Sequence, residues 1–179
     1  ENSYIYSCRA RCKKILKDYQ GAIDDYSKVI ELDPNNRYEY FKRGSAKNEL
    51  EDYQGAIDDY SKALELDPEN DDAWVCRGRA KFNLKNYQGA IDDYTKAIEL
   101  DPDNTIAWLN RGIAKNELED YQGAIDDYSK AIELDPENLE RYCDRAESKY
   151  FSEDYQGAID DYSKALELTT HETDKKEIL

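Results

Sequence analysis

Residues Asp18 to Pro34 read DYQGAIDDYSKVIELDP, and this block decides the fold. Close copies of it begin at Asp52, Asn86, Asp120 and Asp154. The copies follow one another every 34 residues without insertion, and the last has Thr170 where the others have proline. A fixed period of this kind indicates a repeat architecture, in which each unit buries its apolar face only by stacking on its neighbours.

Each copy predicts two helices. In the fourth copy, residues 106–118 read IAWLNRGIAKNEL and form the first helix. Asp120 is the predicted N-cap of a second helix from Tyr121 to about Leu134. Apolar residues of that helix recur at i, i+1, i+4, i+7 and i+8, which gives one buried face. Pro136 then ends the helix. The sequence therefore predicts an all-α fold.

The repeated positions resemble the tetratricopeptide repeat family, whose 34-residue pattern includes an aromatic residue, a glycine, an alanine and a later aromatic residue. The first aromatic position holds Tyr6, Tyr40, Trp74, Trp108 and Tyr142. The glycine position holds Ala10, Gly44, Gly78, Gly112 and Ala146. The alanine position holds Ala22, Ala56, Ala90, Ala124 and Ala158, and the later aromatic position holds Tyr26, Tyr60, Tyr94, Tyr128 and Tyr162.

The resemblance implies a right-handed superhelical solenoid of antiparallel helix pairs. It implies a single array over residues 1–179, with repeats at 3–36, 37–70, 71–104, 105–138 and 139–172. Residues 173–179 are then a short C-terminal tail or a truncated capping helix.

Charged residues also recur in every copy. Where the family often has leucine beside the first-helix glycine, this chain has Arg9, Arg43, Arg77, Arg111 and Arg145. Four residues later it has Lys13, Lys47, Lys81, Lys115 and Lys149. Each second helix has an aspartate pair, such as Asp58 and Asp59. Partly buried charges are costly unless they are paired, so we predict that arginines and aspartates pair across the helix interfaces. Ligand binding by these residues is the alternative.

The composition bounds the possible partners. The chain is 37% charged with a net charge of -16, and no apolar run approaches the roughly 18 residues of a membrane span. We therefore expect a soluble protein without a membrane partner, and the four cysteines at unrelated spacings indicate reduced thiols in a cytoplasmic setting. Excess carboxylates repel phosphates, which argues against nucleic acid, including the RNA read by the related pentatricopeptide class. Because methionine is missing even at position 1, we interpret the chain as a fragment or a processed product.

Residues suited to metal or catalytic chemistry are few. Cys8 and Cys12 could be two metal ligands on one helix, but there is no second pair and His171 is the single histidine. All eight glycines fall at two repeat positions, which leaves none for a phosphate-binding loop. A catalytic triad would have to use His171 in a polar tail. We predict no metal, no cofactor and no enzymatic activity.

Partner binding is expected on the first helix of each pair, which lines the concave surface in the family that the chain resembles. The second helices are nearly identical between copies, whereas the first helices differ and can specify a partner. The candidate groove residues are Tyr4, Arg11, Lys14, Tyr38, Phe41, Asn48, Val75, Arg79, Phe82, Ile106, Leu109, Ile113, Asn116 and Tyr150. The alternative for the apolar ones is that they pack against the first helices of neighbouring repeats.

Charge differs along the predicted groove. Between Ser3 and Lys17 there are five basic residues and no acidic one, whereas acidic residues exceed basic ones between Leu139 and Glu153. We therefore predict a scaffold that binds a protein or peptide segment with an acidic end and an apolar middle. The alternative is a self-assembling module that forms head-to-tail homo-oligomers through its end surfaces.

Overall fold

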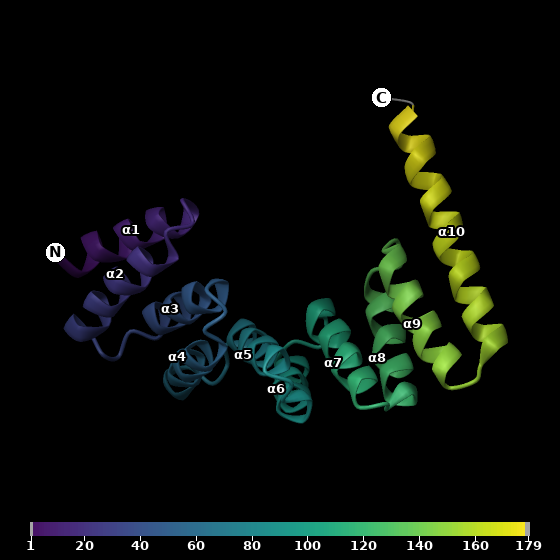
Figure 1. The fold of residues 1–179 in the computed structure, drawn as a ribbon, viewed down its shortest axis with the longest axis horizontal. Helices are drawn as coiled ribbons and strands as arrows, with labels where there is room; N and C mark the ends of the chain where they lie inside the picture. The colour runs from purple at the N-terminus through teal and green to yellow at the C-terminus, as the bar shows by residue number, and fades with distance from the viewer. Residues whose placement is uncertain (1, 178–179) are drawn as a thin grey trace. The chain divides into compact units, whose positions relative to one another are not determined.

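The computed structural model describes the backbone of residues 2–177 and the side chains of residues 2–169, and ten helices follow one another in this part (Figure 1). They are α1 (Asn2–Ile15), α2 (Tyr19–Leu32), α3 (Arg37–Glu49), α4 (Tyr53–Leu66), α5 (Asp71–Asn83), α6 (Tyr87–Leu100), α7 (Thr105–Glu117), α8 (Tyr121–Leu134), α9 (Leu139–Phe151) and α10 (Tyr155–Glu177). Sequential helices form antiparallel pairs, which confirms the predicted all-α fold. None of the helices in the described part is long and apolar enough to cross a membrane.

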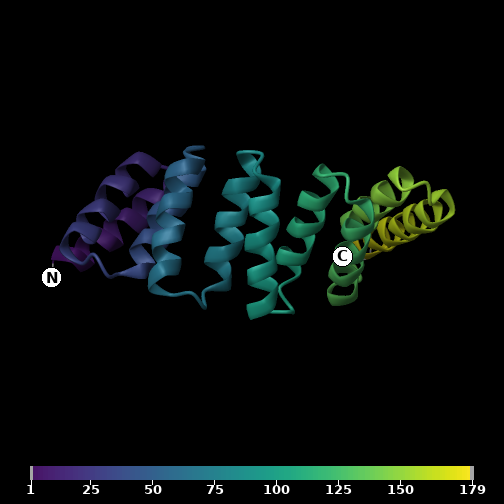
Figure 2. The ribbon, with the colours of Figure 1, turned by 90° about the horizontal axis from the view of Figure 1, so that it is seen from below.

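The helices form two compact units, Glu1–Leu100 with α1 to α6 and Asp101–Leu179 with α7 to α10. In unit 1, each pair packs together, and α2 and α4 also pack against the first helix of the following pair. Unit 2 repeats this order, because α8 packs against both α7 and α9 (Figure 2). Helix α10 continues through residues 173–177, the predicted tail, while residues 178 and 179 and the His171 side chain lie outside the described part.

A capped loop starts each second helix. The Asp52 carboxylate accepts a hydrogen bond from the Gly55 amide, and the other four copies have an equivalent cap, with the Asn86 side-chain oxygen as the acceptor in the third. A Cβ atom on Gly55 would collide with that carboxylate, so the glycine permits the cap. The residue before each cap has a positive φ, for example 60° at Glu119, a conformation that costs a non-glycine residue about 1 kcal/mol.

Small residues let the two helices of a pair approach closely. The Tyr94 ring lies against the backbone of Gly78, where a Cβ atom would be only 2.7 Å from a ring carbon. Tyr26 is 1% exposed and packs with Ala10, Ala22 and Ala46 in the core of unit 1. The small and aromatic residues that alternate in each repeat therefore form the packed surface between the two helices of a pair.

Aromatic side chains near the start of the first helices tie down the preceding loop. The Trp74 indole donates a hydrogen bond to the Pro68 carbonyl at 2.8 Å, and Trp108 does the same to Pro102. In the last repeat, the Tyr142 hydroxyl reaches the Pro136 carbonyl at 3.2 Å. These bonds fix the short connection between consecutive repeats.

Candidate functional site

Paired charges occupy the interface between the two helices of each repeat. Arg43 donates from Nε and Nη2 to the two carboxylate oxygens of Asp59 at 2.9 and 2.6 Å, and Lys47 Nζ lies 2.8 Å from the same carboxylate. Such bidentate pairs fix geometry as well as charge. The same arrangement joins Arg9, Arg77, Arg111 and Arg145 to Asp25, Asp93, Asp127 and Asp161. The predicted pairing is confirmed.

The third guanidinium nitrogen of the arginine, Nη1, donates a hydrogen bond to the preceding repeat. Arg43 Nη1 donates to Ser27 Oγ at 3.0 Å, and Arg145 Nη1 donates to Ser129 Oγ at 3.0 Å. The arginine therefore joins three helices within each unit. The hydrogen bond from Arg9 lowers the pKa of Asp25. Burial raises the pKa of Asp161, but hydrogen bonds from Arg145 and Lys149 more than offset it and leave that pKa below its usual value.

A basic hollow lies between α1 and α3 in unit 1. Its volume is about 290 Å³. It is lined by Tyr4, Ser7, Cys8, Arg11 and Lys42. Glu39 holds one side of it, because Ser7 Oγ and Lys42 Nζ each lie 2.8 Å from Glu39 Oε1. Lys14 Nζ also bridges the two helices by donating to Ser45 Oγ at 2.7 Å. The Arg11 side chain remains exposed beside this network.

The candidate groove residues of unit 1 divide by exposure. Tyr4, Arg11, Tyr38 and Arg79 are exposed, whereas Lys14, Phe41, Asn48, Val75 and Phe82 are half-buried. The Phe41 ring lies 5.6 Å from that of Tyr60, and the Phe82 ring lies 5.1 Å from that of Tyr87. Both phenylalanines thus pack against second helices and contribute to the core as well as to the surface.

The candidates of unit 2 divide in the same way. Ile106 and Tyr150 are exposed, whereas Leu109, Ile113 and Asn116 are half-buried. Asn116 Oδ1 accepts a hydrogen bond from Ser148 Oγ at 3.0 Å, which joins α7 to α9. The Tyr150 ring packs at 5.6 Å against both Phe151 and Tyr155.

Acidic residues lie along α9 in unit 2. Burial raises the pKa of Asp144, and the charges of Glu140 and Glu147 raise it further. The three carboxylates therefore repel one another, and this helix is unfavourable for an anionic ligand. The basic hollow of unit 1, in contrast, favours an anionic ligand.

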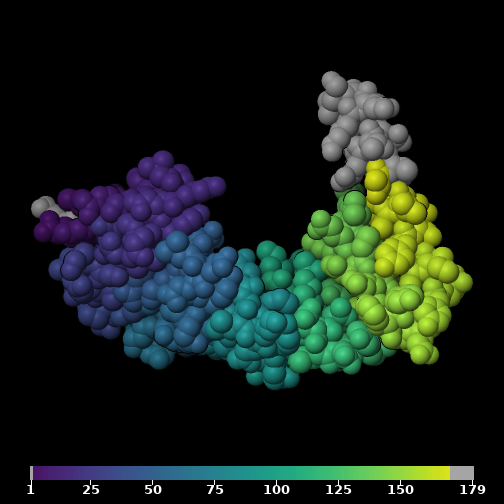
Figure 3. All heavy atoms as spheres, viewed as in Figure 1, coloured from purple at the N-terminus to yellow at the C-terminus, as the bar shows by residue number. Residues whose placement is uncertain are grey.

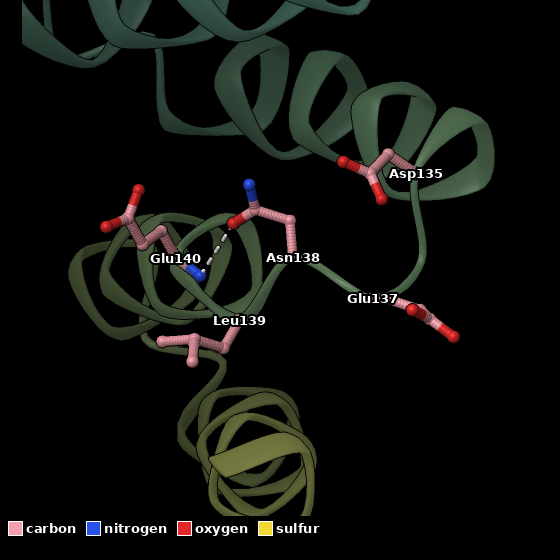
Figure 4. Close-up of a pocket in the computed structure, with 5 residues that line it drawn as sticks. All are labelled: Asp135, Glu137, Asn138, Leu139 and Glu140. Atoms are coloured by element: carbon pink, nitrogen blue, oxygen red, sulfur yellow. Dashed lines mark hydrogen bonds between the residues drawn. The ribbon is translucent and has the colours of Figure 1, made fainter. Parts of the chain in front are cut away.

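A larger hollow, about 460 Å³, lies at the loop between α8 and α9 (Figure 4). It is lined by Asp135, Glu137, Asn138, Leu139 and Glu140. Its polar groups already serve the loop, since Asn138 Oδ1 accepts a hydrogen bond from the Glu140 amide and Asp135 pairs with Arg141 at 2.8 Å. We therefore place the candidate site in the smaller, basic hollow.

Sequence reasoning missed Lys42 and the loop hollow. Lys42 could have been found, because it follows Tyr38 by four residues and shares its helix face. The four cysteines are free thiols. No group of three or more His, Cys, Asp or Glu side chains suited to a metal ion occurs among the described residues.

Comparisons with known proteins agree with the repeat pattern. A family model described as "Tetratricopeptide repeat" matches residues 3–36, 71–104 and 105–138, and one described as "TPR repeat" matches residues 44–85. No curated protein matches the chain.

Three solved structures illustrate the structural likeness. A crystal structure of MamA protein has 27% identity and a TM-score of 0.93, covering 97% of this chain and 95% of that one. MamA from Desulfovibrio magneticus RS-1 has 21% identity and a TM-score of 0.91, covering 96% and 97%. YrrB, "a TPR protein with an unusual peptide-binding site", has 23% identity and a TM-score of 0.80, covering 91% and 84%.

Proposed function

The chain belongs to the tetratricopeptide repeat family, and from this premise we propose that it is a non-enzymatic scaffold that binds an acidic segment of a partner protein. Tetratricopeptide repeats mediate protein–protein interactions, and the family is typically non-catalytic. The proposed site is the face of unit 1 formed by α1, α3 and α5, with the basic hollow between α1 and α3 at its start.

The hollow is the observation that carries this proposal. Arg11 and Lys42 line it together, and Arg79 is exposed on α5, the first helix of the next repeat. In a chain with a net charge of -16, a cationic face is the part of the surface that attracts carboxylates. Complementary charge of this kind sets orientation and association rate.

Exposed aromatic rings supply anchors beside the charges. Tyr4 is 74% exposed and Tyr38 is 56% exposed, and both stand on the first helices that form the proposed face. Tyrosine buries a large area at low entropic cost when a partner covers it. An acidic segment with one or two apolar side chains therefore matches both the charge and the anchors of this face.

The test starts from peptides displayed on phage and selected on the immobilised chain. We expect the recovered peptides to be rich in Asp and Glu, and to bind more weakly as salt rises. Fluorescence anisotropy with a labelled recovered peptide then compares two variants of equal charge. Arg11→Gln with Arg79→Gln should raise the Kd about tenfold. Lys62→Gln with Lys96→Gln, on second helices where both lysine side chains are 45% exposed, should leave it unchanged.

Two results would count against the proposed function. One is the recovery of peptides without acidic residues. The other is equal peptide affinity for the two double variants, which would place binding elsewhere. A labelled polyuridine oligonucleotide is the control for binding of any anionic polymer. If it binds as tightly as the peptide, the face attracts polyanions in general and is not a peptide site.

A further inference from the structure

Two arginines of unit 1 differ from all the others because they have no acidic partner. Seven of the nine arginines pair with an aspartate at 3.0 Å or less, namely Arg9, Arg37, Arg43, Arg77, Arg111, Arg141 and Arg145. Arg11 and Arg79 pair with no carboxylate among the residues whose side chains the structure describes, and both are exposed. In a chain with a net charge of -16, these two guanidinium groups are available to an anionic partner.

The two arginines occupy the same repeat position. They lie two 34-residue periods apart, on α1 and α5, and the equivalent residue of α3 is Ser45. Ser45 accepts a hydrogen bond from Lys14 of α1 at 2.7 Å. Burial raises the pKa of Tyr60, whereas the charge of Arg79 and a hydrogen bond with Ser45 oppose this shift, so both residues lie near one hydroxyl. Arg11, Ser45 and Arg79 therefore form a row across three helices, which we call the arginine row; it belongs to unit 1, drawn from purple to teal in Figure 3.

Helix packing sets the distance between the two charges of the row. Side chains of α1 and α3 are hydrogen-bonded to one another, and α3 contacts α5. Axes of packed helices lie about 8–10 Å apart, so the two steps from α1 to α5 separate the arginines by about 16–20 Å. Six residues of an extended peptide span about 19–20 Å, in a strand or in polyproline II. Six is a multiple of the side-chain period of both conformations, so residues i and i+6 point to the same side in either.

The middle of the row favours an extended segment over a helix. Between the two arginines the row has Ser45, and Asn48 follows one turn later on α3. Both side chains are half-buried and polar. An extended backbone has N–H and C=O groups that polar side chains can bind, whereas a helix uses these groups internally and docks through an apolar stripe.

Nearby carboxylates restrict where an acidic side chain can bind. Asp72 is exposed two helical turns before Arg79 on α5, about 10 Å away along the helix axis. Glu39 lies beside the hollow but is paired with Lys42 at 2.8 Å. An acidic side chain therefore gains most at the arginines themselves, and one displaced toward Asp72 is repelled.

We propose that the arginine row selects extended partner segments with two acidic side chains about six residues apart, one bound by Arg11 and the other by Arg79. This inference rests on the proposed function and adds the spacing that the ligand must have. Each guanidinium group can bind a carboxylate through two parallel hydrogen bonds, which makes the contact sensitive to the position of the acid.

The test uses a peptide recovered by the selection described above. All its acidic residues are changed to glutamine, and two glutamates are then returned at separations from about two to about twelve residues. Fluorescence anisotropy gives the Kd of each peptide. We expect the lowest Kd for the i,i+6 peptide, about tenfold below that of the same peptide with either glutamate alone.

Single arginine variants assign the two contacts. Arg79→Gln should raise the Kd of the i,i+6 peptide about tenfold. It should leave unchanged the Kd of the single-glutamate peptide whose acid binds Arg11. Arg11→Gln should show the reverse pattern, so that each arginine is coupled to one glutamate only.

Moving the second arginine to α3 gives the sharpest result. Ser45→Arg with Arg79→Ser keeps the net charge and brings the two guanidinium groups to about 8–10 Å, so the best separation should fall to about three residues. The matched control is Gln54→Arg with Arg79→Ser, which places the arginine on the exposed face of α4 and should give no best separation. Circular dichroism checks that both variants fold; if Ser45→Arg does not, the single arginine variants decide.

The spacing proposal is overturned if the Kd does not depend on separation, or if the arginine moved to α3 leaves the best separation at i,i+6. It is also overturned if the best separation is about eleven residues, which is the value for a helical ligand. Acidic peptides that bind equally at every separation would reject the spacing and leave the proposed function intact. Failure to recover any acidic peptide would instead reject the proposed function.

Discussion

Arg111 and Asp127 are joined by two parallel hydrogen bonds, from Nε to Oδ2 at 2.8 Å and from Nη2 to Oδ1 at 2.7 Å. The Asp127 side chain is 3% exposed, and Lys115 lies 2.8 Å from its Oδ2. A carboxylate so deeply buried depends on its cationic partners, because an unpaired buried charge is strongly destabilising.

Arg111→Ala should lower the free energy of unfolding by about 3 kcal/mol, because Asp127 is then left with Lys115 alone. Urea unfolding followed by circular dichroism measures this loss. Lys130→Ala is the matched control, since Lys130 pairs with Glu133 on the exposed face of α8 and such pairs contribute about 0.5 kcal/mol. Equal losses in the two variants would show that the buried pair has no special structural role.

Gly112→Ala should destabilise the chain by about 1–3 kcal/mol. The new Cβ atom would lie 2.8 Å from the Tyr128 ring, so the ring or the helix must shift. Glu117→Ala, at an exposed position of the same helix, should change stability by less than about 0.5 kcal/mol. Unchanged unfolding midpoints for Gly112→Ala would mean that the helix pair can accommodate the extra Cβ atom at no cost in stability.

Glu119→Gly should stabilise the chain by about 1 kcal/mol, because Glu119 has a φ of 60° that glycine adopts without strain. A change to glycine inside a helix should instead lower the stability of the chain. Asp126→Gly, on the exposed face of α8, should cost about 1 kcal/mol. Thermal unfolding of the two variants checks the signs, and a loss of stability in Glu119→Gly would contradict the strain argument.

Asp144→Asn should raise stability at neutral pH. Burial, followed by the charges of Glu140 and Glu147, raises the pKa of Asp144 in the folded chain, so its charged form is disfavoured by folding. The charged carboxylate of Asp144 destabilises the folded chain, and this penalty disappears when the carboxyl is protonated. The advantage of the asparagine variant should therefore shrink as pH falls through the raised pKa. Unfolding midpoints measured from neutral to acidic pH test this, and a constant difference would contradict it.

Asp25→Asn should show the opposite dependence and serves as the comparison. The hydrogen bond from Arg9 lowers the pKa of Asp25, so the charged carboxylate stabilises the fold above its unfolded pKa. The variant should be less stable than the unmodified chain at neutral pH. The two should converge as pH falls through the lowered pKa.

The repeat period alone predicted most of the fold. The second helix of the fourth copy was expected from Tyr121 to about Leu134, which are the bounds of α8. The arginine–aspartate pairing was also predicted, although the pattern did not say which aspartate of each pair is used. Asp127 is used because it shares the buried face with Ala124 and Ala131, whereas Asp126 is exposed.

The groove was harder to predict, because spacing gives the face of a helix but not how far a neighbour covers it. Phe41 and Phe82 were candidates for the groove, with packing against neighbouring first helices as the alternative; both are half-buried, and their rings lie 5.6 and 5.1 Å from those of Tyr60 and Tyr87 on second helices. Lys42 was omitted although it lines the hollow. Side-chain contacts between α1 and α3 involve residues more than thirty positions apart, which no local pattern specifies.

The bond from Arg43 to Ser27 recurs as Arg77 to Ser61 and as Arg145 to Ser129. The junctions of α2 with α3, of α4 with α5 and of α8 with α9 therefore share one contact. Deletion or duplication of one 34-residue copy would join matching surfaces, whereas a change of any other length would misalign them. A chain shortened or lengthened by one whole repeat is therefore expected to keep the arginine–serine bond at its new junction.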